Sequence, residues 1–218
     1  MFQLDREWGA LCARFGMRYE DAQRFYVELS AQYERPQRGP FTLEYVGRCL
    51  TAFDEARSLA CIETGVELAL WLVHAVHVPG VSDEQNLEAS VGYARQFVRR
   101  MSLPESAVTR TERLMKAAFD RSTTDHDGEL MADLERSIYG AQPEVYDAFE
   151  AALRESIGHM PDADYNHRTA GRPRFLRGLL DDPPIYRTAH FQKKLEGAAR
   201  QNVLRMLASM TRRLENAS

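Results

Sequence analysis

Two histidines stand three residues apart in the most apolar part of the chain, the segment ALWLVHAVHV of residues 69–78. Residues three apart on a helix share a face, and imidazoles and carboxylates are common metal ligands. His74 and His77 could therefore bind a divalent metal together with Glu67 or Asp133. The alternative is a hydrogen-bonded core histidine beside one that borders a cavity. This second interpretation is favoured for His77, and both stay open for His74.

The elements that position these side chains are all expected to be helices. Apolar residues recur at helical spacing almost throughout, and no segment alternates with the period of two that a strand shows. Gly16, Pro36, Ser82 and Pro143 are the clearest start and stop signals. The expected helices are 4–15, 19–33, 42–58, 61–78, 82–101, 104–119, 129–139, 143–157, 164–180 and 187–215. We predict an all-α fold, a single helical domain of about nine or ten helices over residues 1–218.

Within this pattern the segment 61–78 is predicted to be the central, mostly buried helix, because its apolar residues cover more than one face. The N-terminal residues 1–32 form two further helices, and 187–216 form a long C-terminal helix. His126, in a loop rich in Asp and Thr, is expected at the surface.

Composition restricts the class of protein. The 218 residues are 44% hydrophobic and 28% charged with a net charge of −4, which predicts a globular protein without the basic field that recruits nucleic acid or anionic membrane. No stretch is apolar enough for a bilayer span or a secretory signal. Cys12, Cys49 and Cys61 are widely spaced, which indicates reduced thiols in a cytoplasmic protein.

Two segments carry a resemblance to a known family. Residues 33–50, YERPQRGPFTLEYVGRCL, and residues 69–90, ALWLVHAVHVPGVSDEQNLEAS, are similar to the opening motifs of the small HD-superfamily metal-dependent phosphohydrolases. These normally read R-x-Y-H-x-x-x-H, A-x-W-F-H-D, N-E-x-x-S-A and D-A-D-L. Weaker matches continue to about residue 207, so the resemblance covers about 33–207 and implies an HD-like helical fold.

Most of the metal ligands that the family uses are replaced in this chain. Only Asp133, in MADL where the family has DADL, matches a ligand position. The replaced positions are Phe41 and Tyr45 for the two histidines, Val73 and His74 for the His-Asp pair, and Leu87 for the acidic residue. One or two surviving ligands cannot hold a divalent cation against water. The resemblance therefore implies a site without a metal and without a cofactor.

Cations remain where the ligands are lost. The resemblance carries over Arg38, Arg172 and Arg200, with Glu196 on the helix of Arg200. These arginines could form buried ion pairs, to which Arg is well suited, or an anion cradle, because guanidinium groups match phosphate and sulfate geometry. The expected ligand-binding residues are Arg38, Glu44, Tyr45, His77, Lys116, Arg172 and Arg200, and the expected catalytic residues are His74 and Asp133.

Three functions follow from this pattern. The first is a repurposed, metal-independent HD-fold protein that binds a small phosphorylated or sulfated metabolite. It could catalyse loss or displacement of the anionic leaving group in a specialised biosynthetic pathway, with Arg and Lys stabilising the departing anion. A second is a non-catalytic pseudoenzyme that forms a homo- or hetero-oligomer through the C-terminal helix. A third is a metal-dependent phosphohydrolase with an altered ligand set.

Overall fold

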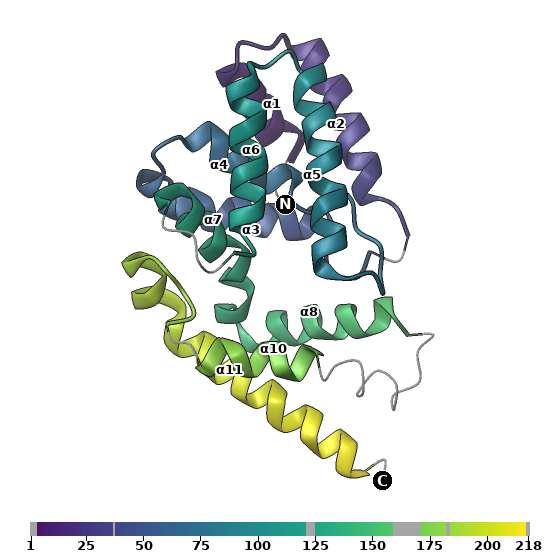
Figure 1. Cartoon of the computed structure of the whole chain (residues 1–218), viewed down its shortest axis with the longest axis vertical. Coiled ribbons are helices and arrows are strands. Elements are labelled where there is room, and N and C mark those ends of the chain that lie inside the picture. The colour runs from purple at the N-terminus through teal and green to yellow at the C-terminus, as the bar shows by residue number, and fades with distance from the viewer. Residues whose placement is uncertain (1–3, 37, 121–124, 159–170, 182–183, 217–218) are drawn as a thin grey trace. The chain divides into compact units, whose positions relative to one another are not determined.

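The computed structural model of the chain describes residues 4–36, 38–120, 125–158, 171–181 and 184–216 (Figure 1). Within these residues all regular structure is helical, with ten α-helices and two short 3-10 helices. The predicted all-α fold is confirmed in this described part. Contacts divide the chain into two compact units, residues 1–134 and 135–218, and each is described by itself. The assignment of the whole chain to one domain stays a prediction.

Seven helices build the first unit, and α4 is the one that the others surround. It packs against α1, α3, α5 and α6, and all residues from 65 to 72 are buried, as predicted for the central apolar helix. Figure 1 shows α5 and α6 side by side. The helices are α1 (Leu4–Arg14), α2 (Tyr19–Tyr33), α3 (Leu43–Ala56) followed by the 3-10 helix η1 (Arg57–Leu59), α4 (Glu63–Leu72), α5 (Asp83–Arg100), α6 (Glu105–Ala117) and α7 (His126–Arg136), whose last two residues fall in the second unit.

Side chains fix the starts of two of these helices. Ser82 and Gln85 form a capping box at the start of α5, which confirms the predicted start at Ser82. The two residues that lead into α4 are held from far along the chain, by the buried carboxylate of Asp127 on α7. It accepts hydrogen bonds from the backbone N–H groups of Cys61 (2.6 Å) and Ile62 (3.1 Å). A carboxylate in this position also offsets the positive end of the helix dipole.

The prediction of one helix over 61–78 is wrong at its C-terminal end, because α4 stops at Leu72. His74 and His77 therefore lie in the turn segment that follows it. The backbone carbonyls of His74 and Ala75 accept hydrogen bonds from the guanidinium of Arg38 instead of from the next helical turn. Since these partners come from another part of the sequence, the apolar pattern alone does not reveal where the helix ends.

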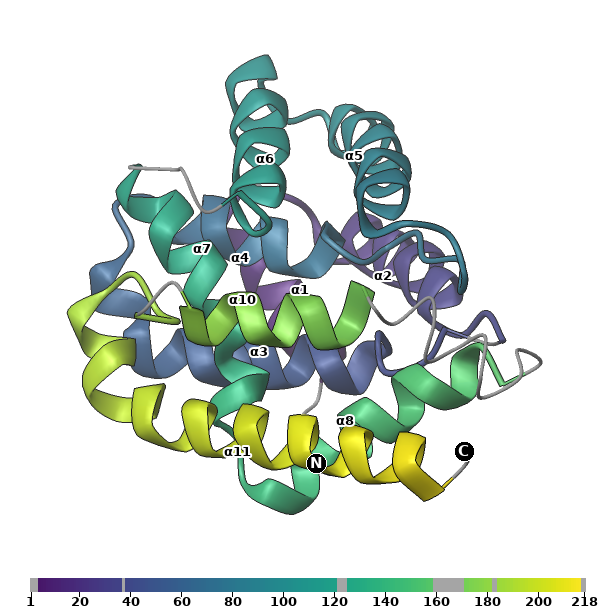
Figure 2. The same cartoon turned by 60° about the horizontal axis from the view of Figure 1, so that its bottom comes forward.

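The second unit is organised around the long helix α11, which packs against η2, α8 and α10. Figure 2 shows α10 alongside α11. Its Asn202 donates hydrogen bonds to the carbonyls of Tyr139 (2.9 Å) and Ala141 (2.8 Å), which fixes η2 against the helix. The elements are η2 (Ser137–Gly140), α8 (Pro143–Ser156), α10 (Gly171–Asp181) and α11 (Ala189–Asn216).

The helices predicted over 143–157 and 187–215 are observed to within two residues, as Pro143–Ser156 and Ala189–Asn216. The predicted helix over 129–139 begins earlier, at His126, and gives way to η2 after Arg136. The predicted start at residue 164 lies outside the described residues. None of the described helices combines the length and apolarity that crossing a bilayer requires.

Candidate functional site

Five rings from three segments of the first unit meet in one place, which we call the histidine–aromatic cluster. Phe41 stacks on His74, with centroids 4.1 Å apart and ring planes 24° apart. The Phe41 ring also lies 4.7 Å from that of His77 and 5.4 Å from that of Tyr45. His74 is edge-on to Tyr45 at 5.5 Å and to Phe119 at 6.0 Å. The structure thus brings together three of the predicted site residues, His74, His77 and Tyr45.

Exposure divides the cluster into an inner and an outer part. Tyr45, on α3, is buried, and so is His74, directly after α4. Phe41 and His77 are half-buried, and Phe119, just beyond α6, keeps 42% of its surface exposed. Phe119 was missed in the sequence because nothing in its local pattern connects it to residues 41–77. The three outer rings are therefore the members of the cluster that keep contact with solvent.

Arg38 is buried next to the cluster, and its guanidinium group is hydrogen-bonded to backbone carbonyls. It is 3% exposed and donates hydrogen bonds to the carbonyls of Phe41 (2.9 Å), Gln32 (2.9 Å), Ala75 (3.3 Å) and His74. The guanidinium also lies 4.8 Å from the ring centroid of Tyr33. Arg38 therefore connects the end of α2, the approach to α3 and the end of α4, and it offers little to a ligand.

Two residues of α5 hold the turn that carries His77. The hydroxyl of Ser90 donates to the carbonyl of Val76 (2.8 Å) and accepts from its N–H (3.1 Å). The Asn86 side chain accepts from the N–H of Val78 (2.8 Å) and donates to its carbonyl (3.1 Å). Asn86 and Ser90 are four residues apart, so they share a face of α5. Two polar residues at this spacing, shortly after the turn signal of Pro79, are the sequence pattern from which these hydrogen bonds to the turn could have been predicted.

Burial sets the protonation state of His77. Desolvation, together with the neighbouring His74 and the positive charge of Arg38, lowers its pKa from 6.5 to about 4. At neutral pH the His77 ring is therefore uncharged and presents one nitrogen as a donor and the other as an acceptor. A partly exposed neutral imidazole suits hydrogen bonding to a ligand better than charge pairing with it.

Protonation of His77 is expected to make stability depend on pH. The unfolded chain binds this proton near pH 6.5 and the folded protein only near pH 4, so stability is complete above about pH 6.5 and falls as the pH drops towards 4. Allowing for solvent screening of a half-exposed ring, the loss is about 2 kcal/mol. Urea denaturation of the wild type and of His77→Gln at about pH 7 and about pH 4.5 measures it.

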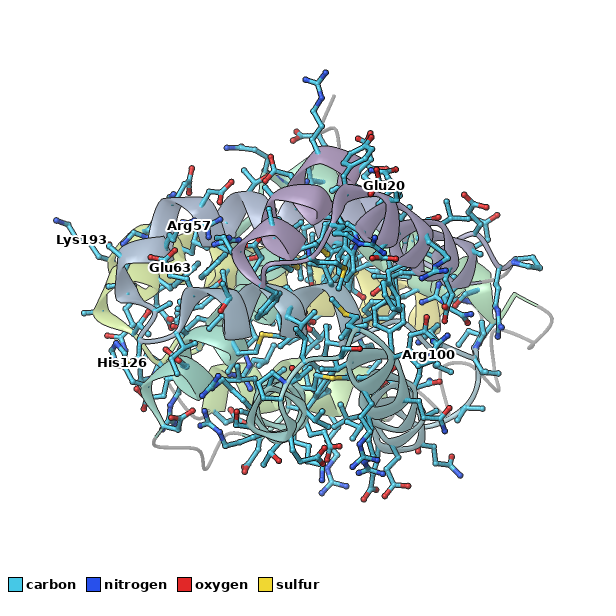
Figure 3. The ribbon with its side chains drawn as sticks, turned by 90° about the horizontal axis from the view of Figure 1, so that it is seen from above. Glu20, Arg57, Glu63, Arg100, His126 and Lys193 are labelled. Atoms are coloured by element: carbon cyan, nitrogen blue, oxygen red, sulfur yellow. The ribbon has the colours of Figure 1, made fainter. Side chains whose placement is uncertain are left out.

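The matched control is His126→Gln, which changes an exposed histidine on the first turn of α7 (Figure 3). This variant should keep the pH dependence of the wild type, whereas His77→Gln should lose the part that belongs to His77. If the free energy of unfolding changed equally between the two pH values in all three proteins, His77 would not be neutralised by its surroundings.

Three other predicted residues of the first unit lie at different depths. Lys116, in the last turn of α6, is exposed, and no described carboxylate pairs with it. It precedes Phe119 by three residues, and the N–H of Phe119 donates to its carbonyl (3.1 Å), so its side chain starts one turn from the cluster. Glu44, in the first turn of α3, is exposed. Asp133 on α7 is fully buried.

Arg172 and Arg200 belong to the second unit, where acceptors within that unit engage both. Arg172 forms a two-pronged pair with the buried Glu150, at 2.5 and 3.2 Å, and its guanidinium lies 5.1 Å from the ring centroid of Phe175. Arg200 lies 3.7 Å from Glu196 and 3.4 Å from the carbonyl of Leu180. These contacts favour the ion-pair interpretation of the two arginines over the anion cradle.

No group of three or more His, Cys, Asp or Glu side chains is arranged to hold a metal ion in the described part of the chain. Phe41, at a position where the family has a histidine, covers one face of His74 and has no lone pair to offer. Glu67, considered above as a partner for the histidines, instead pairs with Arg14 and with Arg57 (2.9 Å). The residues present at this site therefore do not fit the family's metal centre.

Comparisons of the chain with protein-family models, with curated proteins and with solved structures give no match. The resemblance to the HD superfamily rests on the motifs quoted above and stays a prediction.

Proposed function

We propose that this chain is a metal-independent protein of HD-like architecture that binds a small anionic metabolite at the histidine–aromatic cluster. The observation that carries the proposal is the stacking of Phe41 on His74 at 4.1 Å. It puts hydrocarbon where the family's phosphohydrolases have a metal ligand, and it leaves a solvent-facing rim of rings and polar groups. Ligand sites commonly combine such apolar surfaces with a few polar groups that fix orientation.

Lys116 supplies the positive charge in this proposal. Arg38, Arg172 and Arg200 are engaged by the protein's own acceptors, so among the predicted cationic residues we assign this role to the exposed ammonium of Lys116. His77, neutral at physiological pH, contributes a hydrogen-bond donor and an acceptor at the cluster. The buried Tyr45 packs against the rings of Phe41 and His74.

Binding is better supported than catalysis. A general acid or base must come within hydrogen-bond reach of the atom that it protonates or deprotonates. Asp133 is fully buried, and Phe41 covers one face of the buried His74. Loss of a phosphate or sulfate group with His74 or Asp133 moving the proton therefore remains the less favoured form of the proposal.

A panel of phosphorylated and sulfated metabolites tests the proposal by thermal unfolding. A ligand that binds only the folded protein raises its midpoint, and we expect at least one member to do so by about 2 °C or more. Lys116→Ala should remove this shift. Lys193→Ala, which changes an exposed lysine of α11 (Figure 3), should keep it. The proposal is wrong if no anion shifts the midpoint, or if Lys116→Ala leaves the shift intact.

The second candidate is assembly through the C-terminal helix. Beyond Val203 no described residue of α11 is buried, and Leu204 is 56% exposed, so this end of the helix presents apolar surface in the way that partner-binding helices do. A stable oligomer in light scattering, together with no response to any anion, would favour this function. The third candidate, a metallohydrolase with other ligands, requires a stoichiometric divalent ion in protein purified without chelator.

A further inference from the structure

The outer part of the histidine–aromatic cluster consists of ring faces and edges. Phe119 is 42% exposed, and Phe41 and His77 are half-buried. The inner rings fix their positions, since Phe41 is stacked on His74 and Phe119 meets His74 edge-on. The turn bearing His77 is held by Asn86 and Ser90. The rings are therefore a preorganised surface.

Such a surface is suited to a ligand with a planar ring. Aromatic side chains stack on planar rings, and each stacked ring contributes about 1–3 kcal/mol when measured by alanine substitution. A neutral imidazole adds one donor and one acceptor, which match the nitrogen and oxygen atoms on the edge of a heteroaromatic ring. An aliphatic metabolite would use neither property.

Charge alone is too weak to hold the ligand of the proposed function. Lys116 is exposed, and an exposed ion pair contributes about 1 kcal/mol or less. Arg38, which contacts the same segments, is buried and hydrogen-bonded to four carbonyls. An anion bound by Lys116 alone would dissociate readily, so most of the binding free energy has to come from the rings.

Lys116 and Phe119 are close enough to serve one molecule. Phe119 follows Lys116 by three residues in the turn just beyond α6, its N–H donates to the Lys116 carbonyl (3.1 Å), and the lysine stem is flexible. Building on the proposed function, we infer that the ligand carries a planar aromatic ring next to its anionic group, as a nucleoside monophosphate or an aryl phosphate does.

Calorimetric titration with four anions and one neutral compound tests this inference. Adenosine 5′-monophosphate and phenyl phosphate carry both groups, ribose 5-phosphate and inorganic phosphate carry only the anion, and adenosine carries only the ring. We expect the two ring-bearing phosphates to bind at least about tenfold more tightly than the ringless ones, since one stacked ring is worth that much. Adenosine should bind more weakly than its monophosphate.

Variants assign the contributions. Phe119→Ala should weaken the ring-bearing phosphates about tenfold and leave ribose 5-phosphate unchanged, and Lys116→Ala should weaken the phosphates but not adenosine. Phe175→Ala, which removes a ring of similar exposure (44%) in the second unit, is the matched control and should change nothing. The unfolding midpoint of each variant checks that it is folded.

The outcomes separate the two proposals. If ribose 5-phosphate or phosphate binds as tightly as the ring-bearing compounds, the inference about the ring is overturned and anion binding stands. If adenosine binds as tightly as its monophosphate, the ring remains and the anionic ligand class is wrong. If no compound binds, both proposals fail.

Discussion

A Glu67→Gln variant is expected to lose about 3 kcal/mol of the free energy of unfolding, because it breaks a buried ionic network at the centre of the first unit. The side chain of Glu67 is 2% exposed and pairs with both Arg14 and Arg57. Glutamine keeps the volume but removes the charge, so two partly buried guanidinium groups lose their shared counter-ion. Urea denaturation followed by circular dichroism measures the loss.

An exposed pair between neighbouring helices is the control for this experiment. Arg99 and Glu105 lie 2.6 Å apart with side chains 53% and 65% exposed, and Glu105→Gln should leave the unfolding midpoint unchanged. Arg57 also contacts Asp54 (2.5 Å) and, as Figure 3 shows, lies beside Glu63 (3.6 Å). If these exposed acids replaced Glu67 as counter-ions, Glu67→Gln would be as stable as the wild type, and the network would not depend on its buried member.

Glu67 also shows why the metal hypothesis could not be decided from spacing. Residues 67, 74 and 77 are separated as residues on one helical face would be, which made a shared ligand set plausible. The arginines that form ion pairs with Glu67 come from α1 and η1, and α4 ends before His74. Both facts depend on tertiary partners that the local pattern does not contain.

Helix positions were more predictable than the site because their signals are local. Gly16 after α1, the Ser82 cap of α5 and Pro143 at the start of α8 act on the backbone of their own turn. The end of α4 depends instead on side chains from other segments. The histidine–aromatic cluster is of the same kind, since Phe41, His74 and Phe119 meet only after α3, α4 and α6 have packed.

Only part of the predicted site lies together, and the resemblance from which much of it was taken stays a prediction. Tyr45, His74 and His77 do lie together, and the motif residues Asn86 and Ser90 hold the turn beside them. The arginines were expected to face a ligand or to form ion pairs, and their contacts favour structural roles. Guanidinium groups suit both tasks equally well, so their partners in the folded protein decide between them.

Arg38→Ala is expected to destabilise the protein by about 3–5 kcal/mol, since several buried backbone acceptors lose their donor at once. The carbonyls of His74, Ala75 and Gln32 have this guanidinium as a shared partner. Without it the segment after α4 loses its hydrogen-bonded link to the carbonyl of Gln32 on α2, and the bond from the Tyr33 hydroxyl to the Trp71 carbonyl (2.8 Å) remains. Urea denaturation gives the change in stability, with Arg24→Ala, whose side chain is 76% exposed, as the control that should behave as the wild type.

A second measurement separates a structural role of Arg38 from a ligand-binding one. The positive charge of Arg38 contributes to the lowered pKa of His77, so the pKa of His77, followed by NMR titration, should rise in Arg38→Met and stay low in Arg38→Lys. Arg38→Lys keeps the charge but not the branched donors, so it remains measurable if the alanine variant does not fold. If an Arg38 variant kept full stability and lost only anion binding, Arg38 would be a ligand-binding residue and not a structural one.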